Sequence, residues 1–199
     1  MAANTYLTPG ERTLLESARV GIAGAGGLGS NCAMHLVRSG VKHITIVDFD
    51  VVNESNLNRQ FFFRDQLGQK KVEALKENLL RIEPDVDIKA VDLRLDTAST
   101  RSVFADCAIV VEAFDVVDAK AMILAALVGS GKKLVTASGL AGWGRSNAIR
   151  LRRMGPDIVA IGDGETSVGK GVAPVSPRVG IAAAMEANSV VAMLLGKEV

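Results

Sequence analysis

Short apolar runs alternate along this chain with longer stretches in which apolar residues recur every three or four positions. The runs at residues 44–47 and 109–111 show no alternation of apolar and polar positions, which is typical of strands that are covered on both faces. Between residues 68 and 82 the apolar positions fall on one face of a helix, namely Val72, Leu75, Leu79 and Ile82. Pro84 then predicts the end of that helix.

The same reasoning predicts the order of elements along the chain. Strands are expected at residues 19–24, 43–48, 86–91, 108–113, 133–137 and 147–152. Helices are expected at residues 29–38, 68–82, 118–128 and about 178–195, with a long loop at 162–177. Strands that alternate with helices predict an α/β, Rossmann-like fold, in which a mostly parallel sheet carries helices on both faces. We expect one domain that takes in residues 1–199.

Composition narrows the class of protein. Hydrophobic residues make up 48% of the 199 residues, which excludes wholesale disorder. The formal net charge of +1 provides no overall field that would attract nucleic acid or anionic lipid. Two cysteines cannot build a disulfide framework, and the N-terminal segment lacks the pattern of a secretory signal. We therefore expect a soluble, cytoplasmic protein that binds neither nucleic acid nor a membrane.

A glycine-rich turn lies between the first expected strand and the first expected helix. Its glycines are Gly24, Gly26, Gly27 and Gly29. Missing side chains allow backbone N–H groups to approach phosphate oxygens, and the N-terminus of the helix adds positive partial charge. Asp48 ends the second expected strand, where an acid can bond the hydroxyls of a ribose. The turn indicates a nucleotide site, and up to this point ATP and NAD fit it equally well.

Polar residues that follow in the sequence favour ATP over NAD. Arg59 and Lys71 can offer fixed positive charge to a polyphosphate, the first through a planar fork and the second as a point charge. Asp115 follows the fourth expected strand at the same edge of the sheet, where a carboxylate together with phosphates can hold Mg²⁺. Alternatively, Asp115 is the N-cap of a helix that begins at Val116.

Taken together, these segments resemble the ThiF/MoeB family of ubiquitin-activating-enzyme-like adenylyltransferases. The family motifs are G-x-G-G-x-G, D-x-D-x-V-x-x-S-N-L-x-R-Q, G-x-x-K and an aspartate after the fourth strand. They match residues 24–29, 48–60, 68–71 and 115. The resemblance extends from residue 19 to about residue 195. The short length and residues 138–145 resemble the compact, thiamine-pathway members of the family.

The resemblance implies an activity and its participants. Family members adenylylate the C-terminal glycine of a small ubiquitin-like sulfur carrier, here a ThiS-like protein, with ATP and Mg²⁺ and as homodimers. ATP would be bound by Gly24, Gly26, Gly27, Gly29, Asp48, Asp50, Asn56, Arg59, Gln60 and Lys71. Within that set Asp48 would bond the ribose, whereas Asn56, Arg59 and Lys71 would contact the phosphates. Arg59, Lys71 and Asp115 would be the catalytic residues, and Asp115 would hold the magnesium ion.

Two other functions are considered beside this one. An NAD-dependent oxidoreductase would use the glycine turn and Asp48, but it would leave Arg59, Lys71 and Asp115 without a role. A non-catalytic scaffold that binds a carrier protein would not need the full set of nucleotide contacts. The two C-x-x-C pairs that hold zinc in many relatives are missing from this sequence. Cys32 and Cys107 are expected in the core, so we do not expect the chain to relay sulfur.

Overall fold

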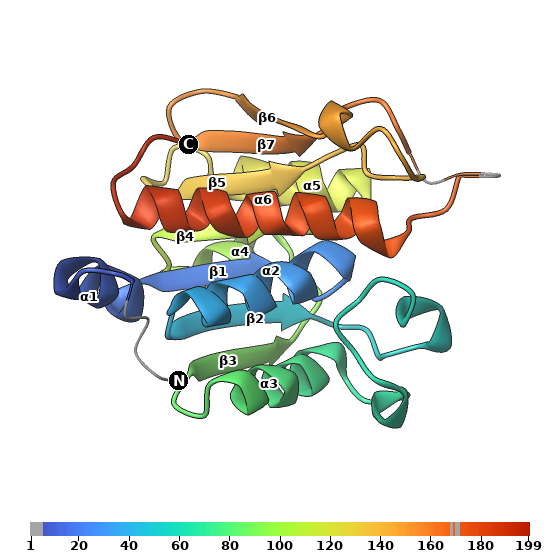
Figure 1. Cartoon of the computed structure of the whole chain (residues 1–199), viewed down its shortest axis with the longest axis horizontal. Coiled ribbons are helices and arrows are strands. Elements are labelled where there is room, and N and C mark those ends of the chain that lie inside the picture. Colours follow the sequence, from blue (N-terminus) through green and yellow to red (C-terminus); the bar gives the residue numbers. More distant parts are fainter. Residues whose placement is uncertain (1–5, 168, 170–171) are drawn as a thin grey trace.

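The computed structural model describes residues 6–167, 169 and 172–199, and its centre is one twisted sheet. Seven strands follow the order β3-β2-β1-β4-β5-β7-β6, and every pairing is parallel except that of β7 with β6 (Figure 1). The strands are β1 (Arg19–Ala23), β2 (His43–Asp48), β3 (Asp87–Asp92), β4 (Ile109–Glu112), β5 (Lys133–Ala137), β6 (Arg150–Arg153) and β7 (Ile158–Gly162). The predicted α/β, mostly parallel architecture is confirmed.

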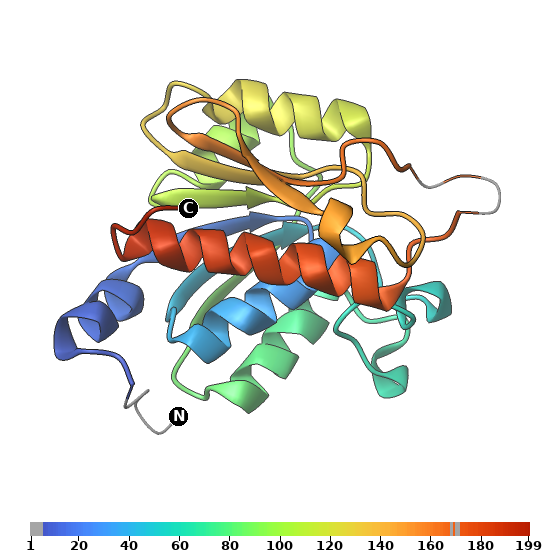
Figure 2. The same cartoon turned by 45° about the horizontal axis from the view of Figure 1, so that its top comes forward.

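Helices cover both faces of the sheet, as Figure 2 shows. One face carries α2 (Gly27–Ser39), α3 (Lys71–Ile82) and α6 (Ser176–Leu194), and the other carries α4 (Thr97–Val103) and α5 (Val117–Leu127). Helix α1 (Pro9–Ser17) lies beyond the amino end of β1. Three short 3₁₀ helices, η1 (Glu54–Asn56), η2 (Arg64–Gln66) and η3 (Ser146–Ala148), lie in the connecting segments.

The core consists of two apolar layers, one on each face of the sheet. Val111 and Val135 pack in the layer under α2 and α6, whereas Val110 and Leu134 pack in the layer under α4 and α5. Neighbouring residues of one strand thus point into opposite layers, and both layers need apolar side chains. This explains why these strands lack a polar alternation.

The strand order creates a natural crevice for a ligand. Along the chain β1 is followed by β2 and β3 on one side, and β4 then returns to the other side of β1. Connections therefore diverge at the carboxyl ends of β1 and β4, the position at which open α/β sheets bind ligands. In Figure 1 the loop after β2, in teal, and the loop after β7, in orange, extend from this same edge.

Several predicted boundaries and elements were wrong. Residues 158–162 form β7, a strand that was not predicted, and the predicted loop begins directly after it and ends at α6; residues 168, 170 and 171 of that loop lie outside the described part. The sixth strand begins at Arg150 because residues 146–148 form η3. Helices α1 and α4 were not predicted, although the capping box of Thr8 and Glu11 and the N-cap of Asp96 mark their starts.

The two cysteines and the hydropathy of the helices were also considered in the sequence. Cys32 and Cys107 are both free and buried, as predicted for small core residues. Burial raises the pKa of both thiols and so favours the neutral thiol at each position. Within the described ranges, none of the helices combines the length and the hydropathy needed to cross a bilayer.

Candidate active site

The glycine turn lies where β1, β2 and β4 approach one another. The N–H of Gly24 donates to the carbonyl of Val47 over 2.8 Å. Gly24 has a φ of 106°, and a Cβ at this position would lie 2.9 Å from the carbonyl oxygen of Ala113. Only glycine adopts this conformation without strain, so Gly24 is required by the turn itself.

The other three glycines of the turn differ in their surroundings. A Cβ on Gly27 would lie 2.9 Å from Val179 Cγ1 in α6, and a Cβ on Gly29 would collide with the carbonyl of Gly24. A Cβ on Gly26, the N-cap of α2, would meet nothing closer than Gln60 Nε2 at 3.9 Å. Close packing therefore explains Gly27 and Gly29, whereas Gly26 presents an open backbone at the N-terminus of the helix.

Asp48 connects the glycine turn to the loop after β2. Its Oδ2 accepts a hydrogen bond from the N–H of Ala25 over 2.7 Å, and its Oδ1 accepts one from the N–H of Asp50 over 2.8 Å. Asp48 is 7% exposed. The buried carboxylate thus orders both the glycine turn and the loop after β2.

Lys71, the first residue of α3, reaches back to this loop. Its Nζ lies 2.8 Å from Asp50 Oδ2, and its backbone N–H donates to the carbonyl of Asp50 over 2.9 Å. The Lys71 side chain is 7% exposed and that of Asp50 is 50% exposed. The pair joins a buried cation to a carboxylate that faces solvent. An anionic ligand can therefore replace Asp50 as the partner of an ammonium group that is already buried.

Arg59 lies beside the start of α2. A Cβ on Gly27 would be 3.4 Å from Arg59 Cγ, which places the arginine stem against the helix N-terminus. Its Nη1 donates to the carbonyl of Ser55 over 3.0 Å and to Asn58 Oδ1 over 2.7 Å. These local bonds fix one end of the guanidinium, and among the described residues no hydrogen bond engages its Nε or Nη2.

Two buried amides lie in the same segment. Asn56 Oδ1 accepts the N–H of Asn53 over 3.0 Å, so its carbonyl oxygen stabilises the 3₁₀ turn. Gln60 Oε1 is buried without a hydrogen-bond partner in the described part of the chain. A buried acceptor without a partner is costly unless a water or a ligand donates a hydrogen bond to it.

Sequence reasoning missed two side chains that hold this segment in place. Ser30 Oγ donates to the carbonyl of Gly26 over 2.6 Å and accepts the N–H of Phe61 over 3.0 Å. Asn31 Nδ2 donates to the carbonyls of Gly27 and Arg59, over 2.7 and 2.9 Å. Both residues are polar positions near the start of a helix that packs against the core, and this was the signal that could have revealed them.

Asp115 lies on the turn between β4 and α5, where it is exposed. The N-cap of α5 is Val116, and no side chain caps the helix, so the alternative that Asp115 is a helix cap was wrong. Among the described residues, no three His, Cys, Asp or Glu side chains are grouped closely enough to hold a metal ion by themselves. Any Mg²⁺ at Asp115 would therefore need phosphate oxygens and water as its other ligands.

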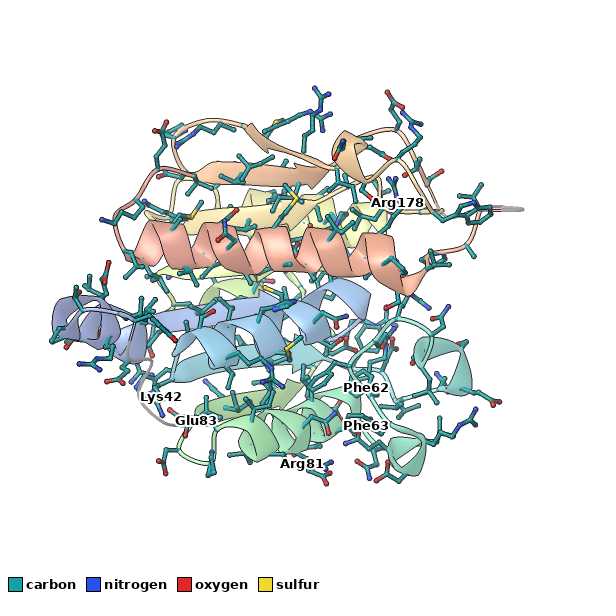
Figure 3. All side chains as sticks on the ribbon, in the orientation of Figure 1. Lys42, Phe62, Phe63, Arg81, Glu83 and Arg178 are labelled. Atoms are coloured by element: carbon teal, nitrogen blue, oxygen red, sulfur yellow. The ribbon has the colours of Figure 1, made fainter. Side chains whose placement is uncertain are left out.

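A buried ion pair on the far side of the crevice was also missed. Arg178, labelled in Figure 3 near the amino end of α6, donates from Nη2 to Asp163 Oδ2 over 2.6 Å. Both side chains are 3% exposed. Arg178 Nη1 also donates to the carbonyl of Gly144 over 2.9 Å, so the pair connects α6, the end of β7 and the glycine-rich segment after β5.

The hydrogen bonds around Asp163 keep it ionised. Burial acts to raise its pKa, but the N–H groups of Thr166 and Glu165, the Thr166 hydroxyl and the Arg178 charge outweigh burial and lower it. Sequence reasoning missed this pair because 15 residues separate its members, and no local pattern shows that they meet.

Comparison with known proteins agrees with this geometry. The model of the ThiF family matches residues 3–199. The molybdopterin-synthase adenylyltransferase of Escherichia coli is 31% identical over 188 residues, which is 92% of this chain and 75% of that protein. The adenylyltransferase and sulfurtransferase UBA4 of Candida glabrata is 38% identical over 143 residues, 71% of this chain and 33% of that protein. The chain thus spans about a third of the length of this relative.

Solved structures provide the same architecture. The tRNA N6-threonylcarbamoyladenosine dehydratase TcdA of E. coli, in complex with ATP, superposes with a TM-score of 0.87 and 22% identity, over 94% of this chain and 90% of that one. At this identity the likeness concerns the fold alone. The family model covers nearly every residue, including the glycine turn, the loop after β2 and the turn at Asp115, and this chain belongs to the ThiF family.

Proposed function

We propose that this protein adenylylates the C-terminal glycine of a small ubiquitin-like sulfur carrier, with ATP as the second substrate and pyrophosphate as a product. One observation carries the proposal. The open N-terminus of α2 at Gly26, the ribose-type carboxylate of Asp48 and the buried ammonium of Lys71 are joined at one edge of the sheet by the contacts of Asp48 and Asp50. The relatives named as adenylyltransferases support it.

The reaction requires positioned reactants and positive charge near the phosphates, and it does not require a general base. A C-terminal carboxyl group has a pKa of roughly 3.5 and is already ionised at neutral pH. A carboxylate oxygen attacks the α-phosphorus, the bond from that phosphorus to the bridging oxygen of the β-phosphate breaks, and pyrophosphate leaves with the electron pair. No proton moves. The residues at the crevice offer two cations, Arg59 and Lys71, to the phosphate charge that develops.

The residues present also fit a magnesium ion. Mg²⁺ is usually held by one or two carboxylates together with phosphates and water. Asp115 offers one exposed carboxylate at the crevice, while Asp50 is engaged by Lys71. When bound, Mg²⁺ would offset the negative charge of the phosphates. In this proposal Asp115 would hold the ion, and Lys71 and Arg59 would orient the phosphate chain.

The carrier is proposed to be ThiS-like, in thiamine biosynthesis. The support is the resemblance of residues 138–145 to short members of the family. A relative is named for molybdopterin synthase, so the carrier of that enzyme is the main competitor. An NAD-dependent reaction is supported less well, because the similar proteins are named as adenylyltransferases and hydride transfer gives no role to Lys71, Arg59 and Asp115.

The test is carrier-dependent exchange of labelled pyrophosphate into ATP. A ThiS-like carrier, a molybdopterin-synthase carrier and each of these lacking its final glycine would be compared at equal concentration. Exchange that requires the intact ThiS-like carrier supports both the activity and the pathway. Exchange with the molybdopterin-synthase carrier alone would contradict the role in thiamine biosynthesis but would still support the adenylylation activity. NAD binding without any carrier-dependent exchange would overturn the proposed function.

We also propose a homodimer. Helix α6 buries one face against α2 and the sheet, yet Ile181 and Met185, which lie one helical turn apart, are only partly covered. Half-buried apolar residues that share one face of a long helix are typical of an interface. Sedimentation equilibrium tests this, and a monomer at micromolar concentration would contradict it.

A further inference from the structure

A second buried ion pair lies directly behind the turn that carries Asp115. Glu112, the last residue of β4, is fully buried. Lys120 of α5 donates from Nζ to both of its oxygens, over 2.8 Å to Oε2 and 3.1 Å to Oε1. Thr136 of β5 donates its hydroxyl to Oε2 over 2.5 Å. Neither charged residue was singled out by the sequence analysis.

This pair holds the backbone of one residue at both ends. The N–H of Phe114 donates to Glu112 Oε1 over 2.8 Å, and the carbonyl of Phe114 accepts from Lys120 Nζ over 2.7 Å. Phe114 immediately precedes Asp115. Glu112 and Lys120 therefore fix the orientation of the peptide from which the Asp115 side chain extends.

The same turn packs against the glycine turn. A Cβ on Gly24 would lie 2.9 Å from the carbonyl oxygen of Ala113 and 3.3 Å from Phe114 Cδ1. The N–H of Ala113 donates to the carbonyl of Ala23 over 2.8 Å. A shift of the turn at Phe114 would therefore change the distance between the Asp115 carboxylate and the helix N-terminus that receives the phosphates.

Stability alone does not account for the pair. Replacing a buried ion pair by apolar residues of similar volume is often neutral or stabilising, because both charges must be desolvated. We propose that Glu112 and Lys120 are positioning residues, which hold the turn at Phe114 so that Asp115 reaches a magnesium ion on bound ATP. This inference rests on the proposed function, and neither residue is proposed to touch the nucleotide.

The test compares two lysines, each in an ion pair with a buried carboxylate. Lys42 pairs with Glu83 over 3.2 Å, and both are labelled in Figure 3 far from Arg178. Exposure of the lysine and glutamate side chains is 24% and 4% there, against 19% and 0% for Lys120 and Glu112. K42M is therefore a matched control for K120M.

ATP affinity is measured by calorimetry with Mg²⁺ and again with EDTA. We expect K120M to weaken binding about tenfold in Mg²⁺, as loss of one positioned charged contact does. We expect little change in EDTA, and K42M should match the wild type in both. K120R should recover most of the loss. If K120M folds poorly, E112Q is measured in its place. The affinity of E112Q for ATP should again fall in Mg²⁺ and not in EDTA.

The double variant D115N/K120M decides between positioning and general damage. Its affinity in Mg²⁺ should equal that of D115N, since Lys120 is proposed to act through Asp115. The inference would be overturned if the losses of ATP affinity in D115N and K120M added in the double variant. It would also be overturned if K120M were less stable but bound ATP as tightly as K42M does. If the wild type binds Mg-ATP but adenylylates no carrier, the proposed function fails and the positioning result still stands. A wild type that binds no ATP overturns both.

Discussion

Lys71 is a buried cation whose partner, Asp50, is half exposed. K71A and R59A should each lower the rate of adenylylation by about 10²–10³, because each removes fixed charge from the developing pyrophosphate. Pyrophosphate exchange measures the rate, and R81A is the control. Arg81 lies in the last turn of the same helix, where it faces the Phe63 ring at 6.0 Å (Figure 3). Wild-type exchange in both K71A and R59A would refute the phosphate assignment.

Asp48 has two tasks at the level of the single residue. It orders the turn through Ala25 and the following loop through Asp50, and it is proposed to bond the ribose. D48N keeps one acceptor oxygen but removes the charge. It should raise the KM for ATP more than it lowers kcat, since a ribose contact exists before and during the reaction. A fall in kcat with unchanged ATP binding would instead place Asp48 at the reacting phosphate.

Asp115 has no capping role to confuse its analysis, because α5 begins without a side-chain cap. D115N should therefore leave the free energy of unfolding within about 0.5 kcal/mol of the wild type, as a surface change usually does. Activity should fall steeply, and raised Mg²⁺ should restore part of it, since the amide binds the cation less well than the carboxylate. An active D115N enzyme with an unchanged magnesium requirement would exclude the metal role.

At the level of elements, the interface between α2 and α6 contains an unpaired carboxyl group. Glu186 of α6 is fully buried, and neither of its oxygens has a hydrogen-bond partner among the described residues. Burial raises the pKa of Glu186 well above its usual value, and the charge of Glu112 adds to the effect while that of Lys120 opposes it. Cys32 of α2 is the neighbouring titratable group, and burial keeps it neutral as well.

The raised pKa makes the stability of this interface depend on pH. Above the ordinary pKa of about 4.3, the unfolded chain loses the proton that the folded chain keeps, so stability falls as pH rises toward the folded pKa. The slope is at most about 1.4 kcal/mol per pH unit. E186Q stays neutral and should remove this fall. Urea unfolding at about pH 5 and about pH 8 measures the free energy of unfolding at each pH. An equal change between the two pH values in the wild type and in E186Q would show that Glu186 is ionised in the fold.

For the whole molecule, the nucleotide itself distinguishes the two proposed chemistries. A ligand at about a hundred times its Kd stabilises the folded state by about 2.7 kcal/mol. For a chain of this size that raises Tm by roughly 5–10 °C. ATP with Mg²⁺ should produce this shift, and NAD at the same concentration should not. The reverse result would favour an oxidoreductase.

Most of the architecture followed from local pattern. Strands β2 and β5 were predicted to the residue, because a run of β-branched residues between turns has few other uses. Strand β7 was missed because its run, residues 158–162, comes shortly after Pro156 in a glycine-rich region. It becomes a strand because β5 and β6 pair with it on either side, which no local pattern shows.

By itself the sequence determined the class of fold, and it supplied the motifs on which the proposed nucleotide site rests, because those motifs are contiguous in the chain and each fits one kind of turn. Only the tertiary structure decided how the residues are used. It paired Lys71 with Asp50, assigned Gly27 to the packing of α2 on α6, and brought Asp163 to Arg178. These contacts join segments that meet only once the order of the strands is set, and a charged residue in a sequence is compatible with many partners until then.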